Sequence, residues 1–194
     1  LVNSINYINI NNIQGDFVEC GVWKGGNLIL FQELNKKYNL NKNIYAYDTF
    51  SGMTKPGKYD FKFDGRSAEK IYQEKKNKNE DWAKSSLNEV KNILFNENIN
   101  IEKINFVVGK VEDTLKKEEN LPKQISILRL DTDFYDSTKI ELEVLYPRLE
   151  KNGVLVLDDY GHFTGVRKAV DEYFNKKAFL IYIDHASRMI IKNF

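Results

Sequence analysis

The sequence has almost no cysteine, no long apolar run and almost no net charge. Its single cysteine, Cys20, lies in an apolar, strand-like segment, so no disulfide framework can form and a reducing, cytoplasmic location is expected. No stretch approaches the roughly 18 consecutive apolar residues of a membrane-spanning helix, and no signal peptide is recognisable. Lys and Arg number 29 against 28 Asp and Glu, a balance that disfavours nucleic acid as a partner.

The length of 194 residues fits one domain of ordinary size. We therefore expect residues 1–194 to fold as a single unit around its own core. No internal repeat and no Pro- or Ser-rich linker divides the chain. It opens on Leu1 rather than Met, so we do not expect it to display the native N-terminus.

Short apolar segments alternate with helix-like segments along most of the chain. We expect strands at Asp16–Cys20, 43–47, Ile104–Val108, Ile125–Leu130 and 154–157. This alternation indicates a parallel sheet covered by helices on both faces. The end of the chain differs, because residues 179–183 and 188–192 flank a turn and predict a hairpin. A parallel sheet that finishes in an antiparallel hairpin fits a Rossmann-like methyltransferase better than a dinucleotide dehydrogenase.

Two pairs of residues have the spacing of helix capping boxes. Ser86 with Glu89, and Thr138 with Glu141, each predict the start of a helix. After the second pair, apolar residues recur at i, i+3, i+4 and i+7, which predicts a helix with one buried face that continues to Leu149.

A long insertion separates the second and third predicted strands. Residues 51–103 occupy a place where one helix would suffice. An excursion from the carboxyl edge of a sheet can cover a ligand crevice, so we expect a lid or substrate-recognition element. An extra packing layer or an oligomer contact is the alternative.

Four aspartates follow the last two predicted parallel strands, namely Asp131 and Asp133, then Asp158 and Asp159. Carboxylates crowded at strand ends repel one another and lose hydration, so they need a compensating cation. Mg²⁺, which takes oxygen ligands, is the simplest candidate. Turn formation and helix capping would explain a single aspartate, and explain both pairs together less well.

A glycine-rich turn follows the first predicted strand, in the segment CGVWKGG. Its spacing matches neither the dinucleotide fingerprint nor the phosphate loop of nucleotide hydrolases. Glu19, at the end of that strand, suits an ammonium group. Asp48 ends the second strand, where an acid commonly holds ribose hydroxyls. Together with the hairpin ending, these features point to S-adenosylmethionine.

Several segments resemble a known family. ECGVWKGG, YDTFSGM, GKVEDTL, LRLDTDFYDSTKIELEVLYPRL and LDDYGHFTGVRKAVDEYF closely resemble the macrocin and mycinamicin type of sugar O-methyltransferases, from about Gly15 to about Phe174. The resemblance implies a class I methyltransferase fold with a seven-stranded sheet, with S-adenosylmethionine and Mg²⁺ as cofactors. It implies methyl transfer to a sugar hydroxyl of a glycan, a nucleotide sugar or a glycosylated natural product.

The same resemblance implies roles for individual residues. Asp131, Asp158 and Asp159 match the metal ligands, and Asp133 matches the proposed general base. His162 is expected at a catalytic position, as a hydrogen-bond partner of the substrate or a support for another residue. The cofactor-binding positions are Glu19, Gly21, Asp48, Thr49, Val111 and Glu112.

Two alternatives remain beside a sugar acceptor. One is methylation of another diol, such as a catechol. The other is a metal-dependent phosphoryl-transfer or hydrolytic enzyme, which explains the aspartates but leaves Glu19 and Asp48 without a task. The expected partner is a small sugar or glycoside, with neither nucleic acid nor membrane. Relatives of this type commonly assemble into dimers or larger forms, which leaves a homo-oligomer open.

Overall fold

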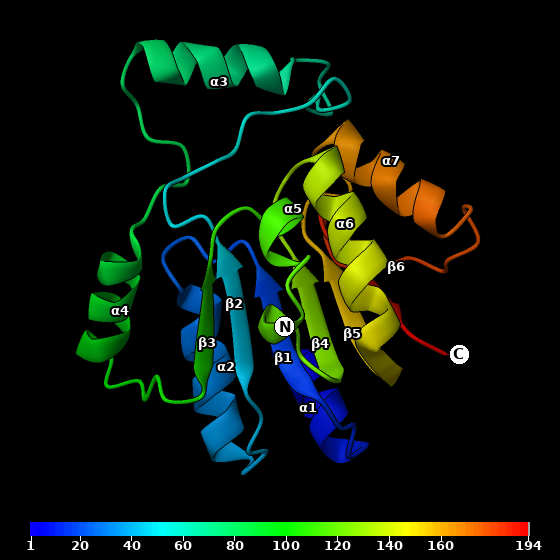
Figure 1. Cartoon of the computed structure of the whole chain (residues 1–194). Helices are drawn as coiled ribbons and strands as arrows, with labels where there is room; N and C mark the ends of the chain where they lie inside the picture. The colour runs from blue at the N-terminus through cyan, green and yellow to red at the C-terminus, as the bar shows by residue number, and fades with distance from the viewer. Residues whose placement is uncertain (194) are drawn as a thin grey trace.

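The computed structural model describes residues 1–193, and Phe194, the last residue of the expected domain, lies outside the described residues. The chain forms one seven-stranded sheet in the order β3-β2-β1-β4-β5-β7-β6 (Figure 1). The strands are β1 (Asp16–Cys20), β2 (Ile44–Asp48), β3 (Ile104–Val108), β4 (Ile125–Leu130), β5 (Leu149–Leu157), β6 (Ile181–Tyr182) and β7 (Arg188–Ile191). β1 to β5 are parallel, whereas β7 pairs antiparallel with both β5 and β6. The mostly parallel sheet with its terminal hairpin is confirmed.

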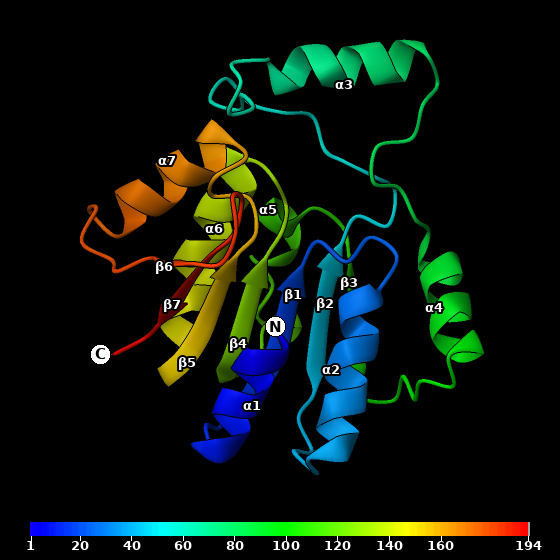
Figure 2. The ribbon, with the colours of Figure 1, turned by 180° about the vertical axis from the view of Figure 1, so that it is seen from behind.

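Helices cover both faces of the sheet (Figure 2). They are α1 (Val2–Ile10), α2 (Gly26–Lys37), α3 (Ala68–Asn77), α4 (Leu87–Asn96), α5 (Val111–Thr114), α6 (Tyr135–Leu145) and α7 (Thr164–Tyr173). Alternate strand residues point to opposite faces. Phe17 of β1 therefore packs with α1, α2 and α4, while its neighbour Val18 packs with α5, α6 and α7. Among residues 1–193, no helix has the length and apolar character needed to cross a membrane.

The helix expected from Thr138 differs from the observed one at both ends. α6 begins at Tyr135, and its N-cap residue Phe134 provides no side-chain hydrogen bond. Glu141, the second half of the expected capping box, instead points inward and is fully buried. The helix also ends early, at Leu145, because Pro147 follows in a short 3₁₀ turn and lacks the N–H that would continue an α-helix. The chain is already in β5 by Leu149.

The insertion between β2 and β3 divides into two parts. α4 starts at the predicted capping box of Ser86 and Glu89, which is confirmed. Its Val90 and Leu94 are buried in the same core cluster as α2, so α4 is the ordinary crossover helix between the two strands. α3 instead stands beyond the carboxyl edge of the sheet (Figure 1), and Ala68 is its only buried residue. We therefore restrict the name "lid" to residues 51–86.

Candidate functional site

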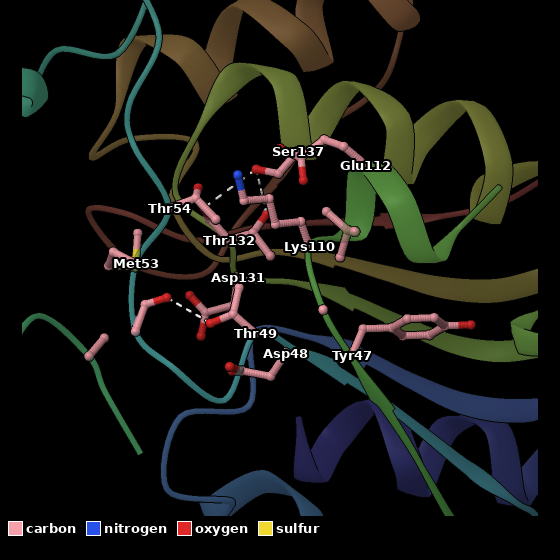
Figure 3. Close-up of a pocket in the computed structure, with 15 residues that line it drawn as sticks. Tyr47, Asp48, Thr49, Met53, Thr54, Lys110, Glu112, Asp131, Thr132 and Ser137 are labelled. Carbon is pink, nitrogen blue, oxygen red and sulfur yellow. Dashed lines mark hydrogen bonds between the residues drawn. The ribbon is translucent and has the colours of Figure 1, made fainter. Parts of the chain in front are cut away.

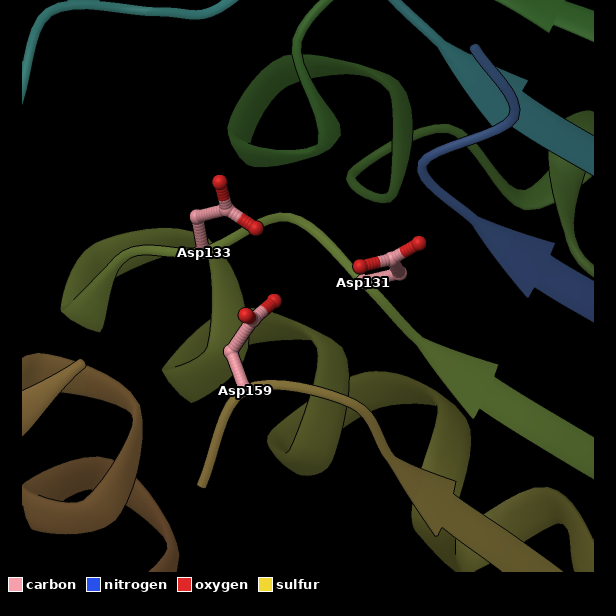
Figure 4. A group of neighbouring side chains, drawn as sticks. All are labelled: Asp131, Asp133 and Asp159. Atoms are coloured by element: carbon pink, nitrogen blue, oxygen red, sulfur yellow. The ribbon is translucent and has the colours of Figure 1, made fainter. Parts of the chain in front are cut away.

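Three of the four aspartates converge at the carboxyl edge of the sheet. Asp131, Asp133 and Asp159 each place a carboxylate oxygen within 4.8 Å of the other two (Figure 4). Asp131 follows β4, Asp133 lies in the turn before α6, and Asp159 lies just beyond β5. Oδ2 of Asp159 is buried with no hydrogen-bond partner among the described residues. A set of oxygen donors with an unpartnered buried carboxylate oxygen fits a hard divalent cation such as Mg²⁺.

The fourth aspartate, Asp158, lies beside this group but contacts a protein cation. Its Oδ1 is 3.0 Å from Nη2 of Arg129 and accepts a hydrogen bond from the Ser187 hydroxyl at 3.3 Å. Burial raises the pKa of Asp131, and the nearby charges of Asp158 and Asp159 raise it further, against the lowering effect of Arg129. Asp158 and Asp131 are thus joined through Arg129, but Asp158 is not one of the three converging aspartates, and its role as a metal ligand stays a prediction.

Arg129 is the residue that the sequence reasoning missed. Its Nη1 donates to Oε1 of Glu19 at 2.9 Å and to Oδ2 of Asp131 at 2.7 Å. With the contact to Asp158, one guanidinium joins acids at the ends of β1, β4 and β5. Its side chain is only 12 % exposed, so this contact is largely shielded from solvent. The available signal was a single charged residue in the otherwise uncharged strand segment ISILRL.

Glu19, near the end of β1, is almost fully buried, with 1 % of its surface exposed. Oε1 accepts hydrogen bonds from the Asn27 side chain at 2.7 Å and from Arg129. Oε2 is buried and has no partner within residues 1–193. Burial raises the pKa of Glu19 to about 7, although Arg129 and Asn27 lower it. One oxygen is therefore committed to the protein, and contact with a cofactor ammonium group stays a prediction.

Asp131, Asp133 and Asp159 form the acidic cluster, and two of its carboxyl groups differ clearly in pKa. Burial and the charge of Asp133 raise the pKa of Asp159 to about 9. Burial also raises the pKa of Asp133, but a hydrogen bond with Asp159 lowers it, and the result is about 6. At neutral pH the first group tends to keep its proton while the second is mostly ionised. In the absence of a metal ion, these carboxyls relieve their mutual repulsion partly by binding protons.

A pocket opens next to the acidic cluster, between the ends of β1 to β4 and the lid (Figure 3). It contains about 550 Å³ of empty space, counted together with the part that is open to solvent. Asp131 lines the pocket and also belongs to the cluster. The predicted cofactor positions that line it are Gly21, Asp48, Thr49, Val111 and Glu112. Glu19 is not among the lining residues.

Asp48 shapes the glycine-rich turn beside this pocket. Its Oδ2 accepts hydrogen bonds from the backbone N–H groups of Val22 at 2.7 Å and Trp23 at 3.0 Å. Its Oδ1 accepts another from Phe50 at 2.7 Å. Gly21, at the start of the turn, has a φ of 87°, and a Cβ there would collide with the carbonyl oxygen of Asp131. The turn is thus fixed both by a carboxylate and by close packing of two strand ends. The predicted contact of Asp48 with a ribose remains untested.

His162 lies on the loop between β5 and α7. Its backbone N–H donates to the carbonyl of Asp159 at 2.9 Å, and its own carbonyl accepts from Phe63 of the lid at 2.9 Å. The rings of His162 and Phe63 are 5.8 Å apart, and Phe63 is 67 % exposed. Burial and the charge of Lys62 lower the pKa of His162. His162 therefore connects the lid to the loop between β5 and α7, which also carries Asp159 and is called the cluster loop below. Its catalytic role stays a prediction.

Comparison with known proteins gives one family and several relatives. The family model described as Macrocin-O-methyltransferase (TylF) matches residues 1–189. Demethyldecarbamoylnovobiocin O-methyltransferase of Streptomyces niveus is 31% identical over 84% of this chain and 59% of its own length. The 8-demethyl-8-(2,3-dimethoxy-alpha-L-rhamnosyl)-tetracenomycin-C 4'-O-methyltransferase of Streptomyces olivaceus is 27% identical over 84% of this chain and 59% of its own length. The chain thus spans about six tenths of the length of these curated relatives.

The structure of the O-methyltransferase NovP superimposes with a TM-score of 0.85 at 28% sequence identity. The match covers 99% of this chain and 77% of that one. The predicted class I methyltransferase fold is confirmed by this likeness together with the observed strand order.

Replacing Arg129 should destabilise the fold strongly. Arg129→Met leaves Glu19, Asp131 and Asp158 without their shared cation, and breaking a buried ion pair typically costs about 3–5 kcal/mol. We expect a loss of that order in the free energy of unfolding, measured by urea denaturation in the presence of a chelator. Arg66→Met is the matched control, because the exposed Arg66 pairs with the neighbouring Asp64 and its loss should change the free energy of unfolding little. Equal stability of the two variants would contradict the role of Arg129.

The stability of the metal-free protein should fall as pH rises. The pKa values of Asp131, Asp133 and Asp159 are raised in the folded state. Between about pH 4 and pH 9 the folded protein therefore binds more protons than the unfolded chain, so raising the pH favours unfolding.

Thermal unfolding in a chelator should show this decline, and added Mg²⁺ should flatten it by replacing the protons. Asp159→Asn should weaken the pH dependence, whereas exposed Asp81→Asn should retain it. A stability that rises across this pH range in the chelator would refute the expectation.

Proposed function

Because the chain belongs to the macrocin O-methyltransferase family, we propose that it transfers a methyl group from S-adenosylmethionine to a hydroxyl of a sugar on a glycosylated small molecule. The observation that carries this proposal is that Asp131 belongs to two neighbouring sites. This residue lines the pocket that contains five of the predicted cofactor positions, and it also belongs to the acidic cluster. A proton acceptor and a methyl donor would then lie side by side.

The choice of a sugar acceptor is supported by what a relative acts on. The Streptomyces olivaceus protein is named for methylating a rhamnosyl group on tetracenomycin C. In the present chain, the lid adds exposed aromatic side chains near the cluster loop, including Phe61 and Phe63. Aromatic faces combined with carboxylates suit a ligand that has both C–H and hydroxyl surfaces.

S-adenosylmethionine would be held by Gly21, Asp48 and Glu112 and would supply an electrophilic methyl group. Glu112 supports this assignment, because its Oε2 is buried without a hydrogen-bond partner in the part of the chain that the structure describes. The glycine-rich turn would bring the backbone close to the cofactor. The lid residues Met53 and Thr54 would close the pocket from the outside.

Mg²⁺ would be held by Asp131, Asp158 and Asp159 and would lower the pKa of an acceptor hydroxyl. Arg129 and Ser187 both contact Oδ1 of Asp158, so Oδ2 would be its ligand atom. Arg129 would fix the orientation of Asp131 and Asp158 before the ion binds. Such support of metal ligands by neighbouring groups is general in metal sites.

Asp133 would serve as the general base. Its pKa of about 6 leaves it mostly ionised at neutral pH, which is the protonation state that accepts a proton. Its carboxylate would take the proton that the acceptor hydroxyl loses as the new carbon–oxygen bond forms. His162, on the loop next to the lid, would donate or accept a hydrogen bond to orient the acceptor.

Asp133→Asn should abolish methyl transfer and leave cofactor binding intact. Loss of a general base typically lowers the rate by about 10²–10⁴-fold. The assay uses S-adenosylmethionine with a labelled methyl group, Mg²⁺, and a panel of nucleotide-linked sugars, rhamnosides and catechols, analysed by mass spectrometry. Calorimetry with S-adenosylmethionine checks the cofactor site independently.

Asp136→Asn is the control, since Asp136 lies in the first turn of the same helix but is exposed. Undiminished methylation by Asp133→Asn would remove Asp133 from its role. Methylation of catechols alone would replace the sugar acceptor with the alternative diol.

Removal of divalent metal should also stop the reaction. Treatment with a chelator should abolish methylation, and Mg²⁺ in excess should restore it. Asp159→Asn should require much more Mg²⁺ for half-maximal rate, because it loses a charged ligand. Full activity in the chelator would sink the metal-dependent mechanism, and the remaining proposal would be methyl transfer by acid–base chemistry alone.

A further inference from the structure

A buried aspartate of the lid reaches the first turn of a core helix. Asp60 is only 2 % exposed. Its Oδ1 accepts a hydrogen bond from the backbone N–H of Tyr135 at 2.8 Å, and its Oδ2 accepts one from Gly57 at 2.7 Å. Tyr135 is the first residue of α6, whose own N-cap residue provides no side-chain cap. Asp60 therefore caps α6 from 75 residues away in the sequence.

The neighbouring helix α7 is shaped to admit this carboxylate. Gly165, in the first turn of α7, lies so close to Asp60 that a Cβ there would collide with Oδ1. The same Cβ would come within 3.0 Å of the Tyr135 nitrogen. The side chain of Asp60 thus fills the space between the first turns of α6 and α7, and only glycine leaves room for it.

The adjoining lid backbone is hydrogen-bonded to Thr164, the first residue of α7. The N–H of Thr164 donates to the carbonyl of Phe61 at 2.8 Å, and the Thr164 hydroxyl donates to the carbonyl of Tyr59 at 2.6 Å. Tyr59 and Tyr135 also pack edge to face, with ring centres 4.8 Å apart. Asp60 therefore lies within a docked segment of the lid, not on a loosely placed loop.

The capped helix begins two residues after Asp133. Asp133 has a left-handed backbone with a φ of 68°, and the next residue, Phe134, is buried between Trp82 of the lid and Phe163. The turn from Asp131 to Tyr135 is therefore held at its start by β4 and at its end by the lid. A shift of the Tyr135 nitrogen would move Asp133 relative to Asp131 and Asp159.

We propose that Asp60 is a positioning residue that couples docking of the lid to the geometry of the acidic cluster, by holding the helix start that carries Asp133. The proposal rests on the proposed function only in the catalytic meaning of that cluster. The physical link is the hydrogen bond to Tyr135 and the enclosure by Gly165. In a rival account, Asp60 stabilises the lid alone and leaves the cluster unaffected.

The test compares two independent substitutions that disturb the contact of Asp60 with Tyr135, together with a matched control. These two substitutions are called the lesions below. In Asp60→Asn one of the two backbone hydrogen bonds is lost, because an amide has a single acceptor oxygen. Gly165→Ala keeps the aspartate at position 60, but the added Cβ would collide with Oδ1 of Asp60 and push its side chain away. Asp64→Asn makes the same chemical change at an exposed lid position, where the Asp64 side chain pairs with the neighbouring Arg66.

Two measurements are made on each full-length variant. Hydrogen–deuterium exchange followed by mass spectrometry reports on the segment 131–136, and electron paramagnetic resonance measures the dissociation constant of Mn²⁺ alone. We expect faster exchange in 131–136 and a dissociation constant raised by about 10-fold or more in both lesions, as is typical when support of a metal site is removed. Asp64→Asn should match the wild type in both.

Faster exchange confined to the lid, with wild-type Mn²⁺ binding, would overturn the proposal in favour of the rival account. Unchanged exchange in both lesions would overturn it as well. If the wild type binds no Mn²⁺, the metal part of the proposed function fails, and the exchange measurement, which needs no metal, decides the role of Asp60 by itself. Should Gly165→Ala fail to fold, Asp60→Asn carries both measurements.

Discussion

The structure depends on how one guanidinium is surrounded by carboxylates at the carboxyl edge of the sheet. Arg129 contacts Glu19, Asp131 and Asp158, which end three adjacent parallel strands. Asp133 and Asp159 add further acidic groups that this single cation does not contact. Burial, together with this excess of negative charge, raises the pKa values of Asp131, Asp133 and Asp159 and creates a demand for a second cation. Stability of the sheet edge and affinity for metal are thus two consequences of one charge imbalance.

The acidic edge of the sheet lies next to the pocket described above. The glycine-rich turn after β1 and the end of β2 form one wall, held by the carboxylate of Asp48. Asp131, whose backbone packs against Gly21 of that turn, lines the pocket and also belongs to the acidic cluster. Parallel strands bring all their carboxyl ends to one edge. A methyl donor and a proton acceptor can therefore be neighbours although their residues lie far apart in the chain.

The lid belongs to the same arrangement and is not merely a cover. Asp60 caps α6, and Trp82 packs against Phe134 in the turn next to Asp133. The loop that carries His162 is hydrogen-bonded to the lid at Phe63. A ligand that displaces the lid would consequently disturb the turn that carries Asp133. Under the proposed function, this contact would link recognition of the acceptor at the lid to the chemistry at the sheet edge.

Local sequence patterns determined the elements of the fold. β1, β3 and β4 lie where apolar runs predict them, and the box of Ser86 and Glu89 starts α4. These features depend on residues a few positions apart, so a single segment contains the necessary information. The aspartates could likewise be predicted to meet, because each pair directly follows a strand of one parallel sheet. Five of the six predicted cofactor positions line a common pocket for the same reason.

Only the tertiary structure decided which charged groups pair. The register that aligns Cys20 with Leu130, and Leu130 with Leu157, brings Arg129 within reach of acids on both neighbouring strands. The start of α6 was misplaced at Thr138 because its cap, Asp60, comes from a distant segment. Hydrogen bonds and ion pairs act over a few ångströms of space, whatever the separation in sequence. The sequence by itself therefore determined the strands and the identity of the acids, and the packed fold determined their partners.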